Sequence, residues 1–174
     1  MDQVNVIVIC ERNQGRRVLN ELLKFGRFEK SIFPDVLTGE VENRGMFLTT
    51  LYRKQSIPIS RVIPIEEFFS FQPEQLVENL KIRIGKYIEG IGANDSFCIN
   101  VERRGSKSII STMALKRELG EYVRQALKRR HENEPTVNLE NPDKTLTIQM
   151  IANMCGIGLI SKQLTNRFSF VWVK

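Results

Sequence analysis

The segment Ile57–Ile65, with the sequence IPISRVIPI, limits the fold more than any other part of the chain. Each of its two prolines lacks a backbone N–H and disfavours the helical conformation in the residue before it, so the segment must be extended. The β-branched stretch Val4–Ile9 predicts a second, buried strand. Between them, leucines at helical spacing predict a helix over residues 15–25, with Gly26 at its C-terminal end.

The remaining apolar pattern completes two parts of the chain. In the first part, an extended stretch over 32–41 and a short helix near 46–51 give a β-α-β-α-β unit compatible with a small ferredoxin-like half. In the second part we predict helices over 73–88 and 111–130 and strands over 97–101, 136–139, 145–154, 156–161 and 168–173. The fold class is therefore α/β, an α+β arrangement with a mixed sheet, divided into domains 1–68 and 69–174. A length of 174 residues suffices for two small domains packed on each other.

The net charge is concentrated in one stretch of the sequence. Residues 101–130 hold nine Lys and Arg against three Asp and Glu, whereas the whole chain holds 26 against 20. The remainder is therefore balanced, with 17 residues of each sign. An even basic excess would bear on solubility alone, but a concentrated one gives an anionic partner a place to dock.

Few residues are suited to catalysis or metal binding. The only histidine, His131, lies in a polar run that is typical of a solvated helix end rather than of an oriented catalytic base. Three cysteines far apart, Cys10, Cys98 and Cys155, predict free thiols in a reducing compartment, without a disulfide framework or a zinc site. We expect no cofactor and no enzymatic activity. Since no apolar run is long enough to span a bilayer and no secretory signal is visible, we expect no membrane association and a cytoplasmic location, or a nuclear or nucleolar one in a eukaryote.

Two glycine-bearing segments leave a nucleotide-binding alternative open. Gly85–Gly92 lacks the Gly-Lys-Ser/Thr ending of a phosphate-binding loop and is better explained as the end of a helix. The turn after the first strand leads through Gly15 into a helix that begins near Arg16 and Arg17. A helix N-terminus with two arginines can hold an anion, but one glycine is weak support, and a plain strand–turn–helix connection is favoured.

The basic stretch begins with a predicted loop. After the strand 97–101, Gly105 lets the backbone approach a phosphate closely, and arginine suits phosphate as a bidentate donor. This loop has little packing reason to hold so many cations. Its candidate RNA-binding residues are Arg103, Arg104, Ser106 and Lys107.

The basic stretch continues as a helix, which Ser111 or Thr112 can cap. Its apolar face should pack inward and consists of Leu115, Leu119, Tyr122, Val123 and Ala126. The opposite face is a narrow stripe of Arg117, Glu121, Arg124 and Lys128. The three cations of this stripe are further RNA-binding candidates, since each neutralised phosphate adds salt-dependent affinity. For Lys116, Arg129 and Arg130 a solvated position without function is the favoured interpretation.

Three segments of the second part resemble the THUMP domain. They are FCINVERRG at 97–105, LKRELG at 115–120 and VNLENPD at 137–143, in the order and at the spacing of that family. The resemblance covers about residues 70–165. The preceding ISRVIPIE, Ile59–Glu66, is similar to the connector after the N-terminal ferredoxin-like domain that usually accompanies a THUMP domain.

This resemblance implies tRNA binding. THUMP domains are RNA-binding appendages of thiouridine synthases, RNA methylases and pseudouridine synthases, where they help present tRNA to a separate catalytic domain. The chain has no room for such a domain, and the resemblance therefore extends to the stand-alone members that assist an acetyltransferase forming N4-acetylcytidine in tRNA. We predict a non-catalytic adaptor whose partners are tRNA and an RNA acetyltransferase or another tRNA-modifying enzyme. Two alternatives stay open: a basic module that binds an acidic protein or forms oligomers, and a small nucleotide-binding enzyme.

Overall fold

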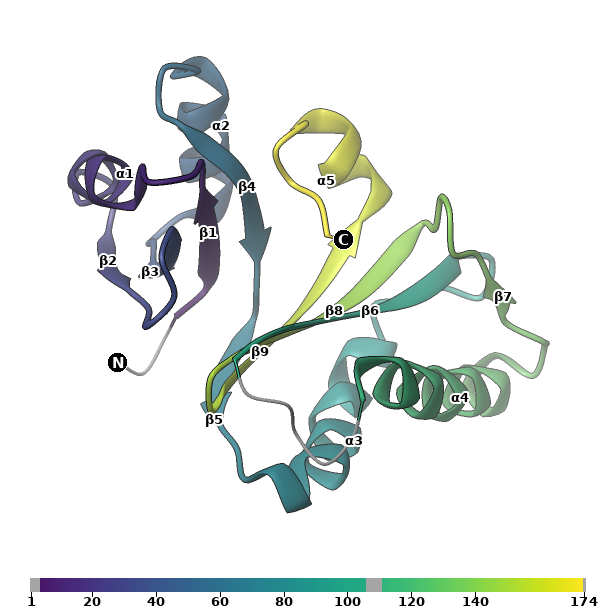
Figure 1. Ribbon diagram of the computed structural model, residues 1–174. Coiled ribbons are helices and arrows are strands. Elements are labelled where there is room, and N and C mark those ends of the chain that lie inside the picture. The colour runs from purple at the N-terminus through teal and green to yellow at the C-terminus, as the bar shows by residue number, and fades with distance from the viewer. Residues whose placement is uncertain (1–3, 106–110, 174) are drawn as a thin grey trace. The chain divides into compact units, whose positions relative to one another are not determined.

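The protein, seen in a computed structural model that describes residues 4–105 and 111–173, forms two compact units. The first unit runs to Phe68 and also includes Leu164–Val173, and the second is Phe69–Gln163. The described residues form a four-stranded sheet and a five-stranded sheet (Figure 1). The four-stranded sheet is antiparallel, whereas the five-stranded sheet combines parallel and antiparallel pairs. The α/β class with a mixed second sheet is thus confirmed.

The first unit follows the order β-α-β-β-α-β. Its elements are β1 (Val6–Cys10), α1 (Gly15–Leu22), β2 (Arg27–Lys30), β3 (Val36–Glu40), α2 (Arg44–Arg53) and β4 (Ile59–Pro64). The strands lie in the order β2-β3-β1-β4, and each is antiparallel to its neighbours. This is a ferredoxin-like arrangement, as the sequence predicted, with one strand that the sequence analysis missed.

The missed strand, β2, is mostly polar. Of its four residues only Phe28 is buried, so the segment lacks the apolar alternation that predicts a strand. Phe28 lies over Gly39 of β3, where a Cβ atom would overlap the ring, and its ring centroid is 5.6 Å from that of Phe47. Pairing with β3 and this one aromatic anchor hold the strand in place.

Gly26 has a different role from the predicted one. Helix α1 ends at Leu22, and Gly26 does not adopt the left-handed conformation of a helix-ending glycine. A Cβ atom at this position would instead overlap the backbone carbonyl oxygen of Glu40. Glycine is required here because the chain entering β2 passes directly against β3.

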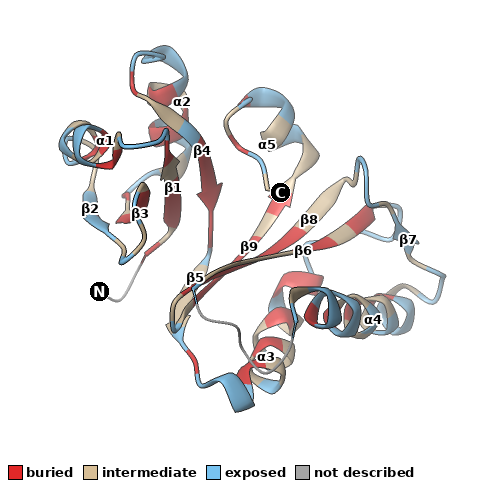
Figure 2. Cartoon of the chain, viewed as in Figure 1, coloured by how far each residue is buried: buried red, intermediate tan, exposed pale blue. Residues whose placement is uncertain are grey.

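The second unit places two helices on one face of its sheet (Figure 1). Its elements are β5 (Glu67–Ser70), η1 (Pro73–Gln75), α3 (Leu76–Ile88), β6 (Ser96–Arg104), α4 (Thr112–His131), β7 (Thr136–Val137), β8 (Lys144–Ile151) and β9 (Met154–Ser161). The strand order is β5-β9-β8-β6-β7, with β6 parallel to both β7 and β8, and β8 antiparallel to β9. The apolar faces of α3 and α4 meet the sheet in one core, in which Leu80, Leu119 and Ile148 are fully buried (Figure 2).

The end of the chain differs from the prediction. After α5 (Lys162–Arg167), residues 168–173 were expected to form a strand, but they are irregular. The Val62 N–H donates to the Phe170 carbonyl over 2.8 Å, and the chain then turns back through a hydrogen bond from Val171 to Phe168. The turn prevents a continuous ladder, so the aromatic side chains of this segment pack on the first unit without forming a strand.

Candidate nucleic-acid interface

Arg103 and Arg104 end strand β6 and do not lie in the loop that the sequence predicted. β6 continues to Arg104 because it pairs with β8 over nearly its whole length, and Ala152 N–H donates to the Arg104 carbonyl over 2.9 Å. Gly105 follows with a φ of 121°, a conformation that favours glycine. The other two candidates of this segment, Ser106 and Lys107, lie outside the described residues.

Arg104 is held within the sheet. Alternation along β6 places Arg104, Glu102 and Asn100 on the face opposite the helices, and Arg103 on the helix side. The Arg104 guanidinium lies 3.2 Å from a Glu102 carboxylate oxygen and donates to the Gln149 amide oxygen over 3.3 Å. The Arg104 and Glu102 side chains are only 18% and 12% exposed. A phosphate would therefore have to displace an internal carboxylate before it could bind Arg104.

Helix α4 follows the prediction closely. Ser111 is its N-cap and accepts a hydrogen bond from the Ala114 N–H over 3.1 Å. The inward face is buried as predicted, with Tyr122 and Ala126 at its margin, and it also includes Leu127. The outer stripe of Arg117, Glu121, Arg124 and Lys128 is accordingly turned away from the core, and Arg117 and Lys128 are exposed.

A carboxylate from beyond the helix neutralises part of this stripe. Glu132 adopts a left-handed conformation, and its N–H donates to the Lys128 carbonyl over 3.0 Å, which ends α4 and turns the chain back. Glu134 then forms ion pairs with Arg124 and with Lys128 Nζ, the latter at 2.7 Å. Arg124 also pairs with Glu121 at 2.9 Å. Sequence reasoning missed Glu134 because a helical wheel contains only residues of the helix.

The protonation states agree with these pairs. The hydrogen bond from Arg124, assisted by one from Gln125, lowers the pKa of Glu121 to about 2. Lys128, followed by Arg124, lowers the pKa of Glu134, and Glu121 together with Glu134 raises that of Arg124. Glu121, Glu134 and Arg124 are therefore charged at neutral pH, and the stripe together with Glu134 holds three cations against two carboxylates, a net charge of +1.

The strand–turn–helix of the first unit already contains an anion. Asp35 accepts hydrogen bonds from the Asn13 and Gly15 N–H groups, each over 2.8 Å, at the N-terminus of α1. These bonds lower the pKa of Asp35, which is therefore ionised. Because this carboxylate occupies the amides that a phosphate would need, the geometry does not favour nucleotide binding at Gly15.

The histidine and the cysteines have structural surroundings. His131 was expected to be solvated, but it is half-buried and its Nε2 lies 2.9 Å from the Ile91 carbonyl oxygen. All three cysteines are free thiols, and burial raises the pKa of Cys10 to about 12. Residues 4–105 and 111–173 contain no group of three His, Cys, Asp or Glu side chains placed to hold a metal ion. Within the same residues, no helix is long and apolar enough to cross a membrane.

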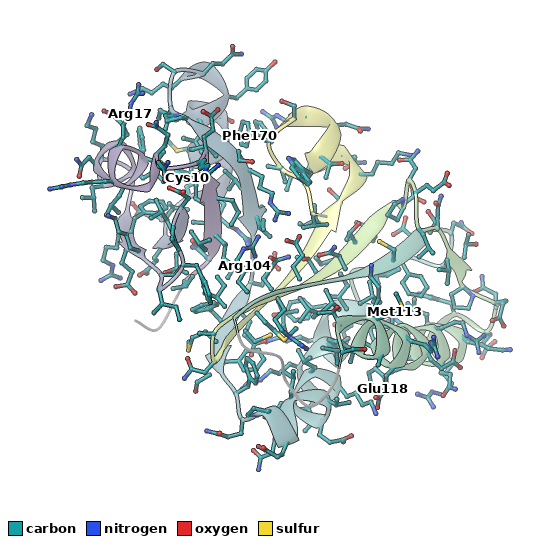
Figure 3. The ribbon with its side chains drawn as sticks, viewed as in Figure 1. Cys10, Arg17, Arg104, Met113, Glu118 and Phe170 are labelled. Carbon is teal, nitrogen blue, oxygen red and sulfur yellow. The ribbon has the colours of Figure 1, made fainter. Side chains whose placement is uncertain are left out.

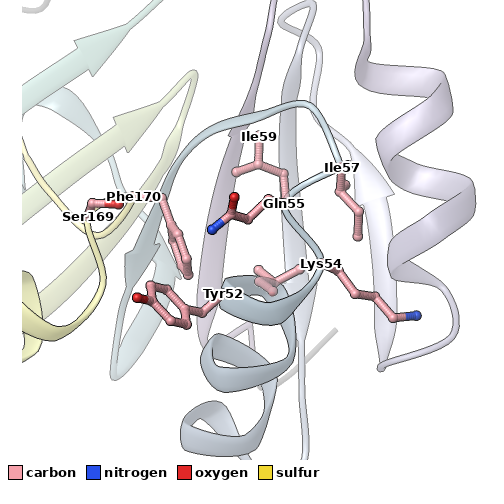
Figure 4. A pocket seen from close by; sticks show the side chains of 8 residues that line it. Tyr52, Lys54, Gln55, Ile57, Ile59, Ser169 and Phe170 are labelled. Carbon is pink, nitrogen blue, oxygen red and sulfur yellow. The ribbon is translucent and has the colours of Figure 1, made fainter.

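An open depression is found in each of the two units. In the first unit, a depression of about 330 Å³ is lined by Tyr52, Lys54, Gln55 and Phe170, among others (Figure 4). None of the candidate RNA-binding residues lies in it. In the second unit, a depression of about 350 Å³ lies between α4, β6 and the chain after β7, and Arg117 and Arg124 are part of its wall.

A comparison with family models matches residues 78–160 to the THUMP domain. The matched range begins in α3 and ends in β9, so it contains the whole basic stretch. No match was found among curated protein sequences.

Solved structures share the fold of both units. PH1313 from Pyrococcus horikoshii is similar with a TM-score of 0.61 and 14% identity over 92% of this chain and 55% of that one. TrmN from Thermus thermophilus is similar with a TM-score of 0.65 and 16% identity, over 88% of this chain and 44% of that one. A 4-thiouridine synthetase in complex with RNA and ATP is similar with a TM-score of 0.55 and 15% identity, over 92% of this chain and 41% of that one. The chain thus spans about half the length of the structures it matches. The chain therefore contains a THUMP domain match at residues 78–160 of the second unit, which follows a first unit with the ferredoxin-like strand order.

Proposed function

We propose that the protein is a non-catalytic tRNA-binding adaptor that presents tRNA to a separate modification enzyme, an acetyltransferase that forms N4-acetylcytidine. The observation that carries the proposal is that the basic stretch 101–130, with nine Lys and Arg against three Asp and Glu, lies within the residues matched to the THUMP domain, mainly on α4. THUMP domains occur in tRNA-modifying proteins as their RNA-binding part. One of the similar structures is described as a 4-thiouridine synthetase in complex with RNA, which supports an RNA ligand for this fold.

The exposed cations of α4 are the first contacts in this proposal. Lys116, Arg117 and Arg129 are exposed and have no carboxylate partner among the described residues. Arg117 would bind phosphate directly, whereas Arg124 and Lys128 would exchange Glu134 for phosphate as the RNA docks. Double-stranded RNA is read largely through its backbone and shape, so such a surface needs no base-specific side chain. Arg103, Arg104, Ser106 and Lys107 remain predicted contacts, with Arg104 limited by its pair with Glu102.

The partner enzyme and the absence of catalysis are further parts of the proposal. Three free cysteines, two of them buried, suit the reducing cytoplasm in which tRNA is modified. The chain would hold tRNA while the partner supplies acetyl-transfer chemistry. Nucleoside analysis of tRNA from a deletion strain tests this part: loss of N4-acetylcytidine is expected, and loss of a different nucleoside, or of none, would contradict acetylation.

Filter binding with total tRNA over a salt series tests the RNA-binding part. We expect affinity to fall steeply as salt rises, and Arg117→Ala to reduce the slope of log K against log salt by about 1. Lys86→Ala is the matched control, since Lys86 is an exposed cation of the same unit that lies on α3. A flat salt response of the unaltered protein, or equal effects of the two variants, would refute RNA binding by α4.

A protein-binding module is the second candidate function. The observation that favours it is an exposed apolar groove beside the basic helix, with Met113, Val137 and Leu139 in its lining. An adaptor needs a surface for its enzyme as well as one for its tRNA, and here the two surfaces share Lys116 and Arg117.

A further inference from the structure

The edge of the second sheet is only partly covered. β7 pairs with β6 at two positions, Ser96 with Thr136 and Phe97 with Val137, and the last bond is from Asn138 N–H to the Phe97 carbonyl at 3.0 Å. β8 covers the other side of β6 as far as Arg104. Beyond Phe97, no described strand pairs with the outer side of β6.

Among the described residues, the outer edge of β6 has backbone groups without a strand partner. In a strand, alternate residues direct their N–H and C=O groups to the same side. The Phe97 carbonyl points toward β7, so the N–H and C=O of Ile99 and Val101 point outward as well. An edge without a strand partner is a template for a further strand unless something covers it, and here Ile99 is 4% exposed and Val101 is half-buried.

An apolar groove runs along the same edge. It is the depression of about 350 Å³ between α4, β6 and the chain after β7, and we call it the α4–β6 groove. Three of its lining residues are large hydrophobic side chains with high exposure: Met113 at 72%, Val137 at 51% and Leu139 at 75%. Met113 comes from the first turn of α4 (Figure 3), whereas Val137 and Leu139 come from β7 and the residues after it. Gly120 adds no side chain, so the wall formed by α4 stays open above Ile99.

The charged part of the groove is positive. Lys116 and Arg117 line it and are exposed, and Arg124 is already paired with Glu121 and Glu134. The groove therefore offers strand hydrogen bonds, apolar walls and two available cations. An extended peptide with apolar and acidic residues at every second position matches all three, because residues two apart in a strand face the same side and Met113, Lys116 and Arg117 all come from α4. RNA matches only the cations, since it cannot supply the ladder of a β-strand.

We propose that the α4–β6 groove binds an extended acidic-apolar segment of a partner protein, which adds to β6 as an extra strand. Apolar side chains of the segment contact Met113, Val137 and Leu139, and its carboxylates pair with Lys116 and Arg117. This inference goes beyond tRNA binding and does not depend on it, because the apolar residues of the groove are outside the proposed phosphate contacts.

The probe is a labelled peptide of about nine residues in which valine and glutamate alternate at the odd positions and threonine fills the even ones, and its binding to the whole protein is followed by fluorescence anisotropy. We expect saturable binding with a dissociation constant below about 1 mM, and at least a tenfold loss with Met113→Ser or Leu139→Ser. Ile82→Ser is the matched control, because Ile82 is 77% exposed on α3 and outside the groove. A peptide with lysine in place of glutamate should bind at least tenfold more weakly. Hydrogen exchange of the Ile99 and Val101 amides should slow when the glutamate peptide binds.

Four results would overturn the inference. They are no saturable binding, an equal loss with Ile82→Ser, equal binding of the lysine peptide, and unchanged exchange of the Ile99 and Val101 amides. A parallel tRNA-binding measurement separates this inference from the proposed function. Met113→Ser and Leu139→Ser should leave tRNA affinity within about twofold, and a loss of tRNA affinity as large as that of peptide affinity would make the groove an RNA surface instead.

Discussion

Glu134 lowers the positive charge of the helix stripe, so its removal should strengthen tRNA binding. In the free protein its carboxylate pairs with both Arg124 and Lys128. A phosphate that binds either cation must compete with this carboxylate and is also repelled by it. Glu134→Gln keeps the shape of the side chain and removes the charge, which raises the net charge of the stripe and Glu134 together from +1 to +2.

The size of the effect follows from Coulomb's law in water. A carboxylate about 6 Å from a bound phosphate repels it enough to lower affinity about threefold at low salt. Release of Arg124 and Lys128 also allows one more phosphate contact, which steepens the slope of log K against log salt by about 0.9. The advantage should therefore be largest at low salt and should shrink as salt rises.

Filter binding of the unaltered protein and of Glu134→Gln, with the same tRNA over one salt series, measures both quantities. Glu140→Gln is the matched control: Glu140 is an exposed carboxylate of the same unit that forms no pair with α4. Equal or weaker binding by Glu134→Gln would refute a phosphate track through Arg124 and Lys128. An equal gain with Glu140→Gln would show that total charge matters and that the position of the charge does not.

Three further predictions concern stability. Gly26→Ala should lower the midpoint of thermal unfolding because its Cβ overlaps the Glu40 carbonyl, and an unchanged midpoint would contradict the close approach. Asp143, whose pKa is lowered by hydrogen bonds from Ser96 Oγ at 2.7 Å and N–H at 2.9 Å, stabilises the protein above its unfolded-state pKa of about 4. The measurement is the difference between the urea unfolding midpoints of the unaltered protein and of Asp143→Asn, followed against pH. This difference should be constant above about pH 4 and should become smaller as the pH falls through the lower pKa of Asp143 in the folded protein. A difference that stays constant down to about pH 2 would exclude this linkage. Ser111→Ala should lower the free energy of unfolding, measured in urea, by about 1 kcal/mol, because α4 loses its N-cap hydrogen bond. An unchanged free energy of unfolding would mean that the Ser111 side chain does not stabilise the helix.

The sequence predicted best what depends on neighbouring residues. Helix α4 was predicted from its cap to its last residues because its apolar spacing and its Ser111 cap are local signals. β4 was equally clear, since two prolines exclude a helix whatever surrounds them. Strand β2 had no such signal, because its place depends on pairing with β3 and on one aromatic contact over Gly39.

The candidate site was harder to predict because its charges are arranged by tertiary structure. Parallel pairing with β8 extends β6 through Arg104, which turns two supposed loop cations into strand residues. A left-handed residue at Glu132 returns Glu134 to the helix, where it pairs with cations up to ten residues earlier in the chain. Neither the extension of β6 nor the ion pairs of Glu134 can be predicted from the local sequence, since each depends on where another segment of the chain lies.

These arrangements reverse the order in which the cations of residues 101–130 are available to an anion. Arg104 is held by Glu102, and Arg124 and Lys128 are held by Glu134. The sequence pattern favoured a solvated position without function for Lys116 and Arg129, yet both are exposed and have no carboxylate partner among the described residues. An incoming phosphate binds most readily where no internal carboxylate has to be displaced. Lys116, Arg117 and Arg129 should therefore make the first contacts with RNA, and Arg124 and Lys128 should join only after Glu134 is displaced.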